Sequence, residues 1–128
     1  MQGYRHAGIR EAHTERLIER GLLFDYYGGL LNEKNKRIYE AAAVEDMSLS
    51  EISEEMGISR QAVSETLRRI DIRLQGYDKE LGLISKGRRI GGYLGELRDL
   101  LAGAGHVSVK AADKKGIEKI LKKIEEEL

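Results

Sequence analysis

Residues 48–70 read SLSEISEEMGISRQAVSETLRRI, and this stretch decides the fold of the 128-residue chain. Ser48 and Glu51 have the spacing of a capping box, in which the two side chains satisfy backbone N–H groups at the start of a helix. Met47 and Ile52 occupy the two positions of a hydrophobic staple around the same start. The pattern therefore predicts a short helix that begins directly after Ser48.

Gly57 is expected to divide the stretch into two helices. Glycine adopts a positive φ without steric cost, so it can form the sharp corner between them. Ser59 is expected to cap the second helix, which begins at Arg60, while Ile58 fills the corner. Small Ser53 lets the second helix pass close to the first, although alanine is the usual residue at its position. Two helices joined in this way form a helix-turn-helix.

The second helix carries an apolar series that steps alternately by four and three residues, as in a heptad pattern. It predicts a long fourth helix from Arg60 to about Lys86, roughly 40 Å at 1.5 Å per residue. Its second half extends past a small core, so it needs another partner: the first helix, the C-terminal region or a second copy of the chain. The series consists of Val63, Leu67, Ile70, Leu74, Tyr77, Leu81 and Ile84.

The opposite side of this helix is polar, because successive residues are rotated by about 100° around the helix axis. Arginine can bond guanine through two hydrogen bonds, glutamine can bond adenine in the same way, and flanking arginines can hold phosphates. The N-terminus of such a helix meets the major groove. The predicted nucleic-acid-binding residues are Ser59, Arg60, Gln61, Ser64, Glu65, Arg68, Arg69 and Arg73.

A different interpretation of the same residues is an ordinary helical hairpin with a solvated, arginine-rich side. Glu65 on the polar side would repel phosphate, as would Glu51, Glu54 and Glu55 of the preceding helix. Ile72 also lies outward, and an exposed isoleucine can mark a protein contact. The sequence is therefore compatible with a nucleic-acid contact and with a protein contact on this side.

Helical periodicity covers most of the remaining chain, which predicts an all-α protein. Before the helix-turn-helix we expect helices at about 15–31 and 33–44, the second capped by Asn32. The expected organisation is a poorly ordered segment 1–14, a helix-turn-helix domain 15–87 and a C-terminal helical extension 88–128.

The charge of the chain argues against a generic polyanion binder, because 22 basic and 22 acidic residues give a net charge of zero. The charges are nevertheless unevenly placed. Residues 32–58 contain three basic and seven acidic side chains, whereas residues 59–90 contain eight basic and four acidic ones. A basic segment that follows an acidic one is found in small nucleic-acid readers, and also in many solvated helices.

Signals for catalysis or membrane insertion are absent from the sequence. Without cysteine there is no thiolate metal site and no cysteine nucleophile. His6, His13 and His106 stand apart from any metal-binding motif. We therefore expect no enzyme activity, catalytic residue, cofactor or metal. The chain also has no signal peptide and no apolar run of about 20 residues, so we expect a cytoplasmic protein without a membrane partner.

Residues 22–89 resemble the YlxM-like family of small bacterial proteins, whose helix-turn-helix is similar to region 4 of sigma factors. The similarity is carried by LLFDYYGGLL at 22–31, SLSEISEEMGISRQAVSETLRRID at 48–71 and IRLQGYDKELGL at 72–83. It fades beyond Gly87. The family's recognition positions correspond here to Ser59, Arg60, Gln61, Ser64, Glu65 and Arg68.

The resemblance implies a sigma-region-4-like bundle, often dimeric, that binds nucleic acid and is linked to the signal recognition particle pathway. The leading hypothesis is a non-enzymatic accessory or regulatory protein that binds duplex DNA or structured RNA and acts in that pathway. The alternative is an adaptor of the particle's GTPase or its receptor that does not read DNA sequence. We also expect a homodimer through the long helix or the extension.

Overall fold

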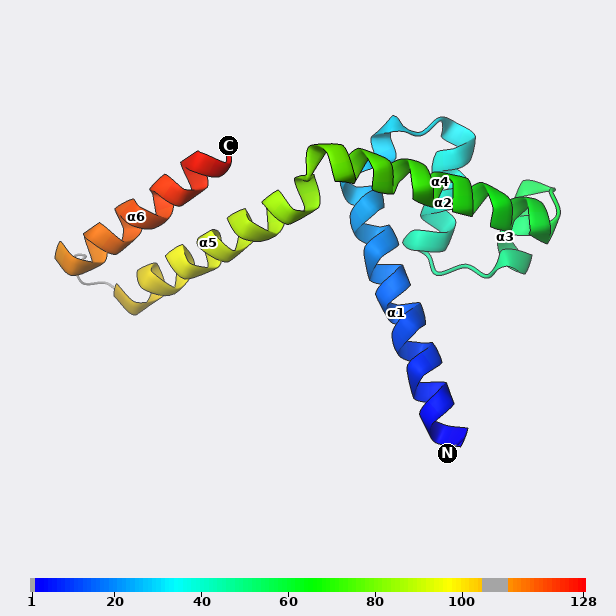
Figure 1. Ribbon diagram of the computed structural model, residues 1–128, viewed down its shortest axis with the longest axis horizontal. Coiled ribbons are helices and arrows are strands. Elements are labelled where there is room, and N and C mark those ends of the chain that lie inside the picture. The colour runs from blue at the N-terminus through cyan, green and yellow to red at the C-terminus, as the bar shows by residue number, and fades with distance from the viewer. Residues whose placement is uncertain (1, 105–110) are drawn as a thin grey trace. The chain divides into compact units, whose positions relative to one another are not determined.

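The computed structural model describes residues 2–104 and 111–128, with side chains over 11–103 and 113–128. These residues form helices and no strand, which confirms the prediction of an all-α helix-turn-helix bundle (Figure 1). The elements are α1 Gln2–Tyr27, the 3₁₀ turn η1 Gly28–Leu30, α2 Glu33–Ala43, α3 Leu49–Met56, α4 Arg60–Leu81, α5 Leu83–Ala104 and α6 Ala111–Glu127.

The first helix differs from the expectation at both ends. α1 begins at Gln2 and not near residue 15, so the segment that we expected to be poorly ordered is helical over residues 2–14. The segment has no proline, and six of its thirteen residues are alanine, arginine, glutamine or glutamate, which favour helix. At its other end α1 stops at Tyr27, because Gly28 and Gly29 turn into η1.

The fourth helix ends earlier than its apolar series indicates. α4 stops at Leu81, not at about Lys86, and Gly82 follows with φ 63°. The backbone N–H of Gly82 donates to the carbonyl of Asp78 at 2.7 Å and closes the last turn. Glycine at this position needs no strain for the left-handed conformation. A repeat of apolar residues continues across the helix end, so the pattern alone overestimates the helix length.

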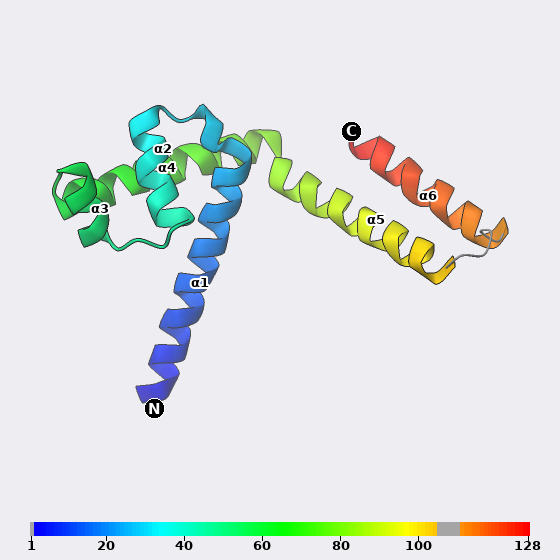
Figure 2. The same ribbon diagram turned by 180° about the vertical axis from the view of Figure 1, so that it is seen from behind.

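The chain forms two compact units, residues 1–82 and 83–128. The division lies at Gly82, whereas the sequence placed it between residues 87 and 88. In the first unit α1, α2 and α3 all pack against α4, as the two opposite views show (Figures 1 and 2). Its buried apolar side chains are Leu23, Tyr27, Leu31, Ile38, Tyr39, Ala41, Ala42, Ala43, Ile52, Val63, Leu67, Ile70 and Leu74.

The second unit is an antiparallel hairpin of α5 and α6 (Figure 2). Arg89 of α5 donates to Glu127 of α6 at 2.7 Å, and Lys123 lies over the ring of Tyr93 at 5.7 Å. Ile120 is the one buried apolar side chain among the described residues of this unit, at 7% exposure. This hairpin confirms the expected C-terminal helical extension.

None of the helices in the described part of the chain has the length and apolar character needed to cross a bilayer.

Candidate nucleic-acid interface

Both ends of α3 form as the sequence predicts. The backbone N–H of Glu51 donates to the Ser48 hydroxyl at 3.1 Å, and the Ser48 N–H donates to the Glu51 carboxylate at 3.1 Å. This capping box starts α3 at the expected residue. Gly57 ends α3 with φ 66° and ψ 32°, which confirms its expected left-handed corner.

Ser53 stabilises the turn through a hydrogen bond as well as through its small size. Its hydroxyl donates a hydrogen bond to the carbonyl of Ile58 at 2.5 Å, across the corner at Gly57. An alanine, the usual residue here, could not make this bond. The bond joins α3 to the residue before the Ser59 cap, so it fixes where α4 can begin.

α4 is anchored by one side and open on the other. The Ala62 N–H donates to the Ser59 hydroxyl at 3.0 Å, which caps the helix as predicted. Val63 and Leu74 are fully buried, and Leu67 and Ile70 are 3% exposed. Beyond these residues the apolar series leaves the core, because Leu81 is 59% exposed. Only the first part of the series therefore fixes the orientation of α4.

A polar junction that the sequence analysis missed joins three helices around Asp71. The Arg20 guanidinium of α1 donates through Nε and Nη2 to the Asp71 carboxylate of α4, the shorter distance being 2.8 Å. The Tyr39 hydroxyl of α2 donates to the same carboxylate at 2.8 Å. Desolvation of the buried ring and the bond to Asp71 raise the pKa of Tyr39 above its ordinary value.

The junction fixes the rotation of α4 about its own axis. Asp71 lies at the edge of the buried side, so holding its carboxylate toward α1 and α2 turns the opposite side of α4 outward. The partners are separated by 51 and 32 positions in the chain. No local sequence motif identifies Arg20 and Tyr39 as partners of Asp71. The sequence shows only an isolated aspartate on a predicted helix.

The eight predicted nucleic-acid-binding residues all have exposed side chains on α4 or its cap, and we refer to them as the recognition surface. They are Ser59, Arg60, Gln61, Ser64, Glu65, Arg68, Arg69 and Arg73, and each is exposed. The structure thus brings the predicted set together on α4 and its cap. Four of its members are arginines, against one glutamate.

Contacts within the recognition surface are weak or local. The Gln61 amide donates to the Glu65 carboxylate at 3.4 Å, and Arg69 donates to the Thr66 hydroxyl at 3.3 Å. Arg73 is held more firmly, because its Nε donates to the Tyr77 hydroxyl at 2.7 Å and its guanidinium lies over that ring. Apart from the Ser59 cap and Arg73, the bonds in this surface are 3.3–3.5 Å long, so a ligand that replaces them gives up little.

The acidic residues of α3 are partly neutralised. Arg37 of α2 donates to Glu55 at 2.7 Å and pairs with Glu45 at 2.8 Å. The hydrogen bond from Arg37 lowers the pKa of the Glu55 carboxyl below its ordinary value. Glu51 is engaged in the capping box. The repulsion of phosphate expected from this helix is therefore weaker than its count of carboxylates indicates.

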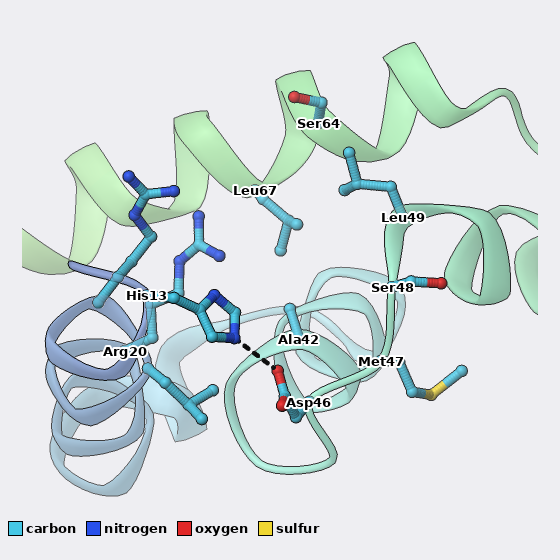
Figure 3. Close-up of a pocket in the computed structure, with 11 residues that line it drawn as sticks. His13, Arg20, Ala42, Asp46, Met47, Ser48, Leu49, Ser64 and Leu67 are labelled. Carbon is cyan, nitrogen blue, oxygen red and sulfur yellow. Dashed lines mark hydrogen bonds and ion pairs between the residues drawn. The ribbon is translucent and has the colours of Figure 1, made fainter. Parts of the chain in front are cut away.

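A cavity of about 300 Å³ lies on another side of the unit, between α1, the α2–α3 loop and α4 (Figure 3). Leu67 points into it from α4, and the His13 ring contacts the Asp46 carboxylate at 3.3 Å along one edge. Of the recognition surface, only Ser64 lines this cavity. Ser64 therefore lies on the flank of α4 nearest α1, apart from Glu65 and Arg68.

Nothing in the described residues resembles a metal site, since no group of three histidine, aspartate or glutamate side chains converges there. Of the three histidines noted in the sequence, His13 is exposed and contacts Asp46. The side chain of His6 and the whole of His106 lie outside the described residues.

Comparison with known proteins agrees with this geometry. A family model described as "Putative helix-turn-helix protein, YlxM / p13 like" matches residues 14–120, which include the whole of the turn and α4. The chain belongs to this UPF0122 family. The resemblance seen in the sequence is thereby confirmed, and the match extends into the C-terminal hairpin, beyond Gly87 where the resemblance had faded.

Individual UPF0122 proteins are similar over much of their length. A protein of Desulforamulus reducens is 43% identical over 106 residues, which cover 80% of this chain and 87% of the relative. One of Symbiobacterium thermophilum is 44% identical over 80 residues, or 62% of this chain and 75% of the relative. One of Shouchella clausii is 35% identical over 88 residues, or 69% and 81%. The family is described by its helix-turn-helix and not by an enzyme activity.

Proposed function

We propose that this chain is a non-enzymatic, nucleic-acid-binding accessory or regulatory protein that docks α4 in the major groove of duplex DNA. One observation carries the proposal: all eight residues of the recognition surface are exposed, while the apolar residues on the other side of α4 are buried. A helix-turn-helix that presents an arginine-rich second helix in this way has the geometry for groove docking.

The recognition surface offers separate residues for phosphates and for base edges, which favours duplex DNA. Arg69 and Arg73 lie on one flank of α4, where guanidinium groups can contact phosphates. Arg68 and Gln61 lie nearer the centre of the outer side and are suited to base edges. With a net charge of zero for the chain we expect modest affinity and a dependence on few phosphates.

Binding to a fluorescent duplex, measured by anisotropy at several salt concentrations, tests the proposal. Affinity should fall as salt rises, with a slope of about −0.9 per phosphate contacted. Arg69→Ala should reduce that slope by about one, whereas Arg98→Ala, which removes an exposed arginine from α5, should leave it unchanged. A structured RNA hairpin serves as competitor, and stronger binding to it than to DNA would contradict the choice of duplex DNA.

The place of this protein in the cell is the finer part of the proposal. The resemblance of residues 22–89 to YlxM-like proteins with a sigma-region-4-like helix-turn-helix supports a cytoplasmic role in the signal recognition particle pathway. Its partners there would be the particle's RNA, its GTPase or the receptor. Sedimentation of the purified protein with each component separately tests this role, and failure to co-sediment with all three would reject it.

An adaptor role without DNA reading is the second candidate, and Ile72 is the observation that favours it. This isoleucine is 59% exposed on the outer side of α4. If α4 contacts a protein, Ile72→Ala should weaken capture of the GTPase or receptor while Arg68→Ala and Gln61→Ala have no effect. A nucleic-acid reader should instead lose duplex binding with Arg68→Ala and Gln61→Ala and should capture neither protein.

The proposal includes a homodimer, supported by the apolar side chains that the second unit leaves uncovered. Leu94 is 47%, Leu101 51% and Leu121 43% exposed on the α5–α6 hairpin. A two-helix hairpin cannot bury both of its sides by itself. Sedimentation equilibrium should give twice the chain mass of 14.4 kDa, and a monomer at high protein concentration would reject the dimer.

A further inference from the structure

The outer side of α4 contains one apolar side chain in a charged setting. Glu65, Arg68, Arg69 and Ile72 together line a shallow groove of about 450 Å³. Ile72 is 59% exposed and lies roughly half a turn around the helix axis from fully buried Val63. Its side chain is therefore on the side of α4 that a ligand would contact.

The spacing of these four residues is i, i+3, i+4 and i+7, which places them on one side of a helix. Recognition helices of homeodomains read bases in the major groove with side chains at this same spacing. Such a helix contacts bases along its length and not only at its first turn. The groove lined by Glu65 and Ile72 thus has the layout of a base-reading strip.

We propose that Ile72 reads the 5-methyl group of a thymine and that Glu65 reads the amino group of a cytosine. The inference rests on the proposed binding to duplex DNA and names the bases that the site selects. Apolar side chains recognise thymine through its methyl group, and glutamate accepts a hydrogen bond from the cytosine N4 amino group. Arg68, between them, can bond the O6 and N7 of a guanine.

The charged neighbours of Ile72 favour this assignment over a protein contact. The core of a protein interface is depleted of charge and contains several apolar side chains. Here Arg68 and Arg69 border the isoleucine, and Glu65 completes the groove. One apolar side chain among guanidinium groups matches a thymine methyl group between phosphates better than it matches an apolar protein surface.

The carboxylate of Glu65 acts here as a hydrogen-bond acceptor for a base, in addition to carrying a negative charge. A carboxylate only accepts hydrogen bonds, and the cytosine amino group is the one donor that a cytosine presents in the major groove. The Gln61 amide donates to Glu65 at 3.4 Å, a long bond that a base can replace. Glu65 therefore adds selectivity for cytosine, although its negative charge lowers the affinity for DNA.

The helix geometry fixes the spacing of the two bases. Residues 65 and 72 are seven positions apart, which is about 10.5 Å along the helix axis. With a rise of about 3.4 Å per base pair, α4 lying along the groove should read positions roughly three base pairs apart. A selected sequence should therefore show a cytosine and a thymine at this separation, with a guanine preferred between or beside them.

The experiment selects binding sequences from a pool of randomised duplexes with the full chain, and then replaces the preferred thymine by deoxyuridine. Loss of the methyl group should weaken binding of the unaltered chain about fourfold, the effect of removing one buried methyl group. For Ile72→Ala the thymine and deoxyuridine duplexes should bind equally. Glu65→Gln should lose the cytosine preference while the thymine preference stays.

Leu81→Ala is the matched control, because Leu81 is 59% exposed, as Ile72 is, and also lies on α4. It should retain the discrimination between thymine and deoxyuridine. Duplex binding without any selected sequence would overturn the base assignment and leave the proposed binding to DNA intact. Absence of duplex binding would reject both. Unchanged selection by Ile72→Ala, with loss of a protein contact instead, would assign this residue to the adaptor function.

Discussion

The carboxylate of Asp71 on α4 is held by the guanidinium of Arg20 on α1, with Nη2 and Oδ2 2.8 Å apart and both side chains about one-fifth exposed. Tyr39 of α2 donates its hydroxyl to the same carboxylate. Side chains of three helices thus meet at the mostly buried carboxylate of Asp71. This junction determines which side of α4 faces outward, so it links the stability of the bundle to the presentation of the recognition surface.

Replacing Asp71 should therefore destabilise the first unit. In Asp71→Asn the Arg20 guanidinium loses its counter-charge in a half-buried place, which should cost about 2 kcal/mol of unfolding free energy. Urea unfolding followed by circular dichroism measures this cost. Asp25→Asn, an exposed aspartate on α1, is the control and should change stability by less than about 0.5 kcal/mol. An equal effect of the two substitutions would contradict the role of the junction.

Tyr39 should make the protein sensitive to alkaline pH. Burial, followed by the hydrogen bond to Asp71, raises the pKa of its hydroxyl above the ordinary value of 10. The folded state then keeps the proton while the unfolded state releases it, so this contribution to stability is complete below about pH 10 and declines above it. Absorbance at the tyrosinate band against pH should include a step in which Tyr39 ionises only on unfolding. Tyr39→Phe should lack this late step.

Glu55 should make a smaller contribution at the acid end. The hydrogen bond from Arg37 lowers the pKa of its carboxyl below the ordinary value of 4.5. Its stabilising effect is therefore present above about pH 4.5 and is lost as the pH falls through the lowered pKa. Unfolding midpoints measured from pH 6 to pH 3 should fall less for Glu55→Gln than for the unaltered chain. Parallel curves would contradict the pairing.

The corner of the helix-turn-helix should respond to both of its small residues. Gly57 has φ 66°, so Gly57→Ala should cost roughly 1–2 kcal/mol from backbone strain. Gly57→Asn should cost less, since asparagine tolerates this conformation. Ser53→Ala removes the bond to the Ile58 carbonyl and should cost about 1 kcal/mol. Thermal unfolding distinguishes these values, and a stabilising Ser53→Ala would show that alanine suits this corner better.

Local signals predicted the part of the fold that depends on neighbouring residues. The capping box at Ser48, the left-handed corner at Gly57 and the cap at Ser59 all act over a few positions, so their residue types suffice. The exposed recognition surface followed in the same way, because α4 has one apolar side and one polar side. By contrast, the apolar series overran the end of α4, since side-chain periodicity does not respond to the backbone conformation of Gly82.

Sequence alone thus determined the helix-turn-helix, its corner and the residue types that α4 offers to a ligand, since each depends on contacts within one or two helical turns. Tertiary structure alone decided which distant side chains hold α4 in that rotation and which carboxylates of α3 are neutralised. Arg20 and Tyr39 reach Asp71 across 51 and 32 positions, and Arg37 reaches Glu55 across 18. Pairings at such separations depend on how the helices pack, which no local pattern of residues records.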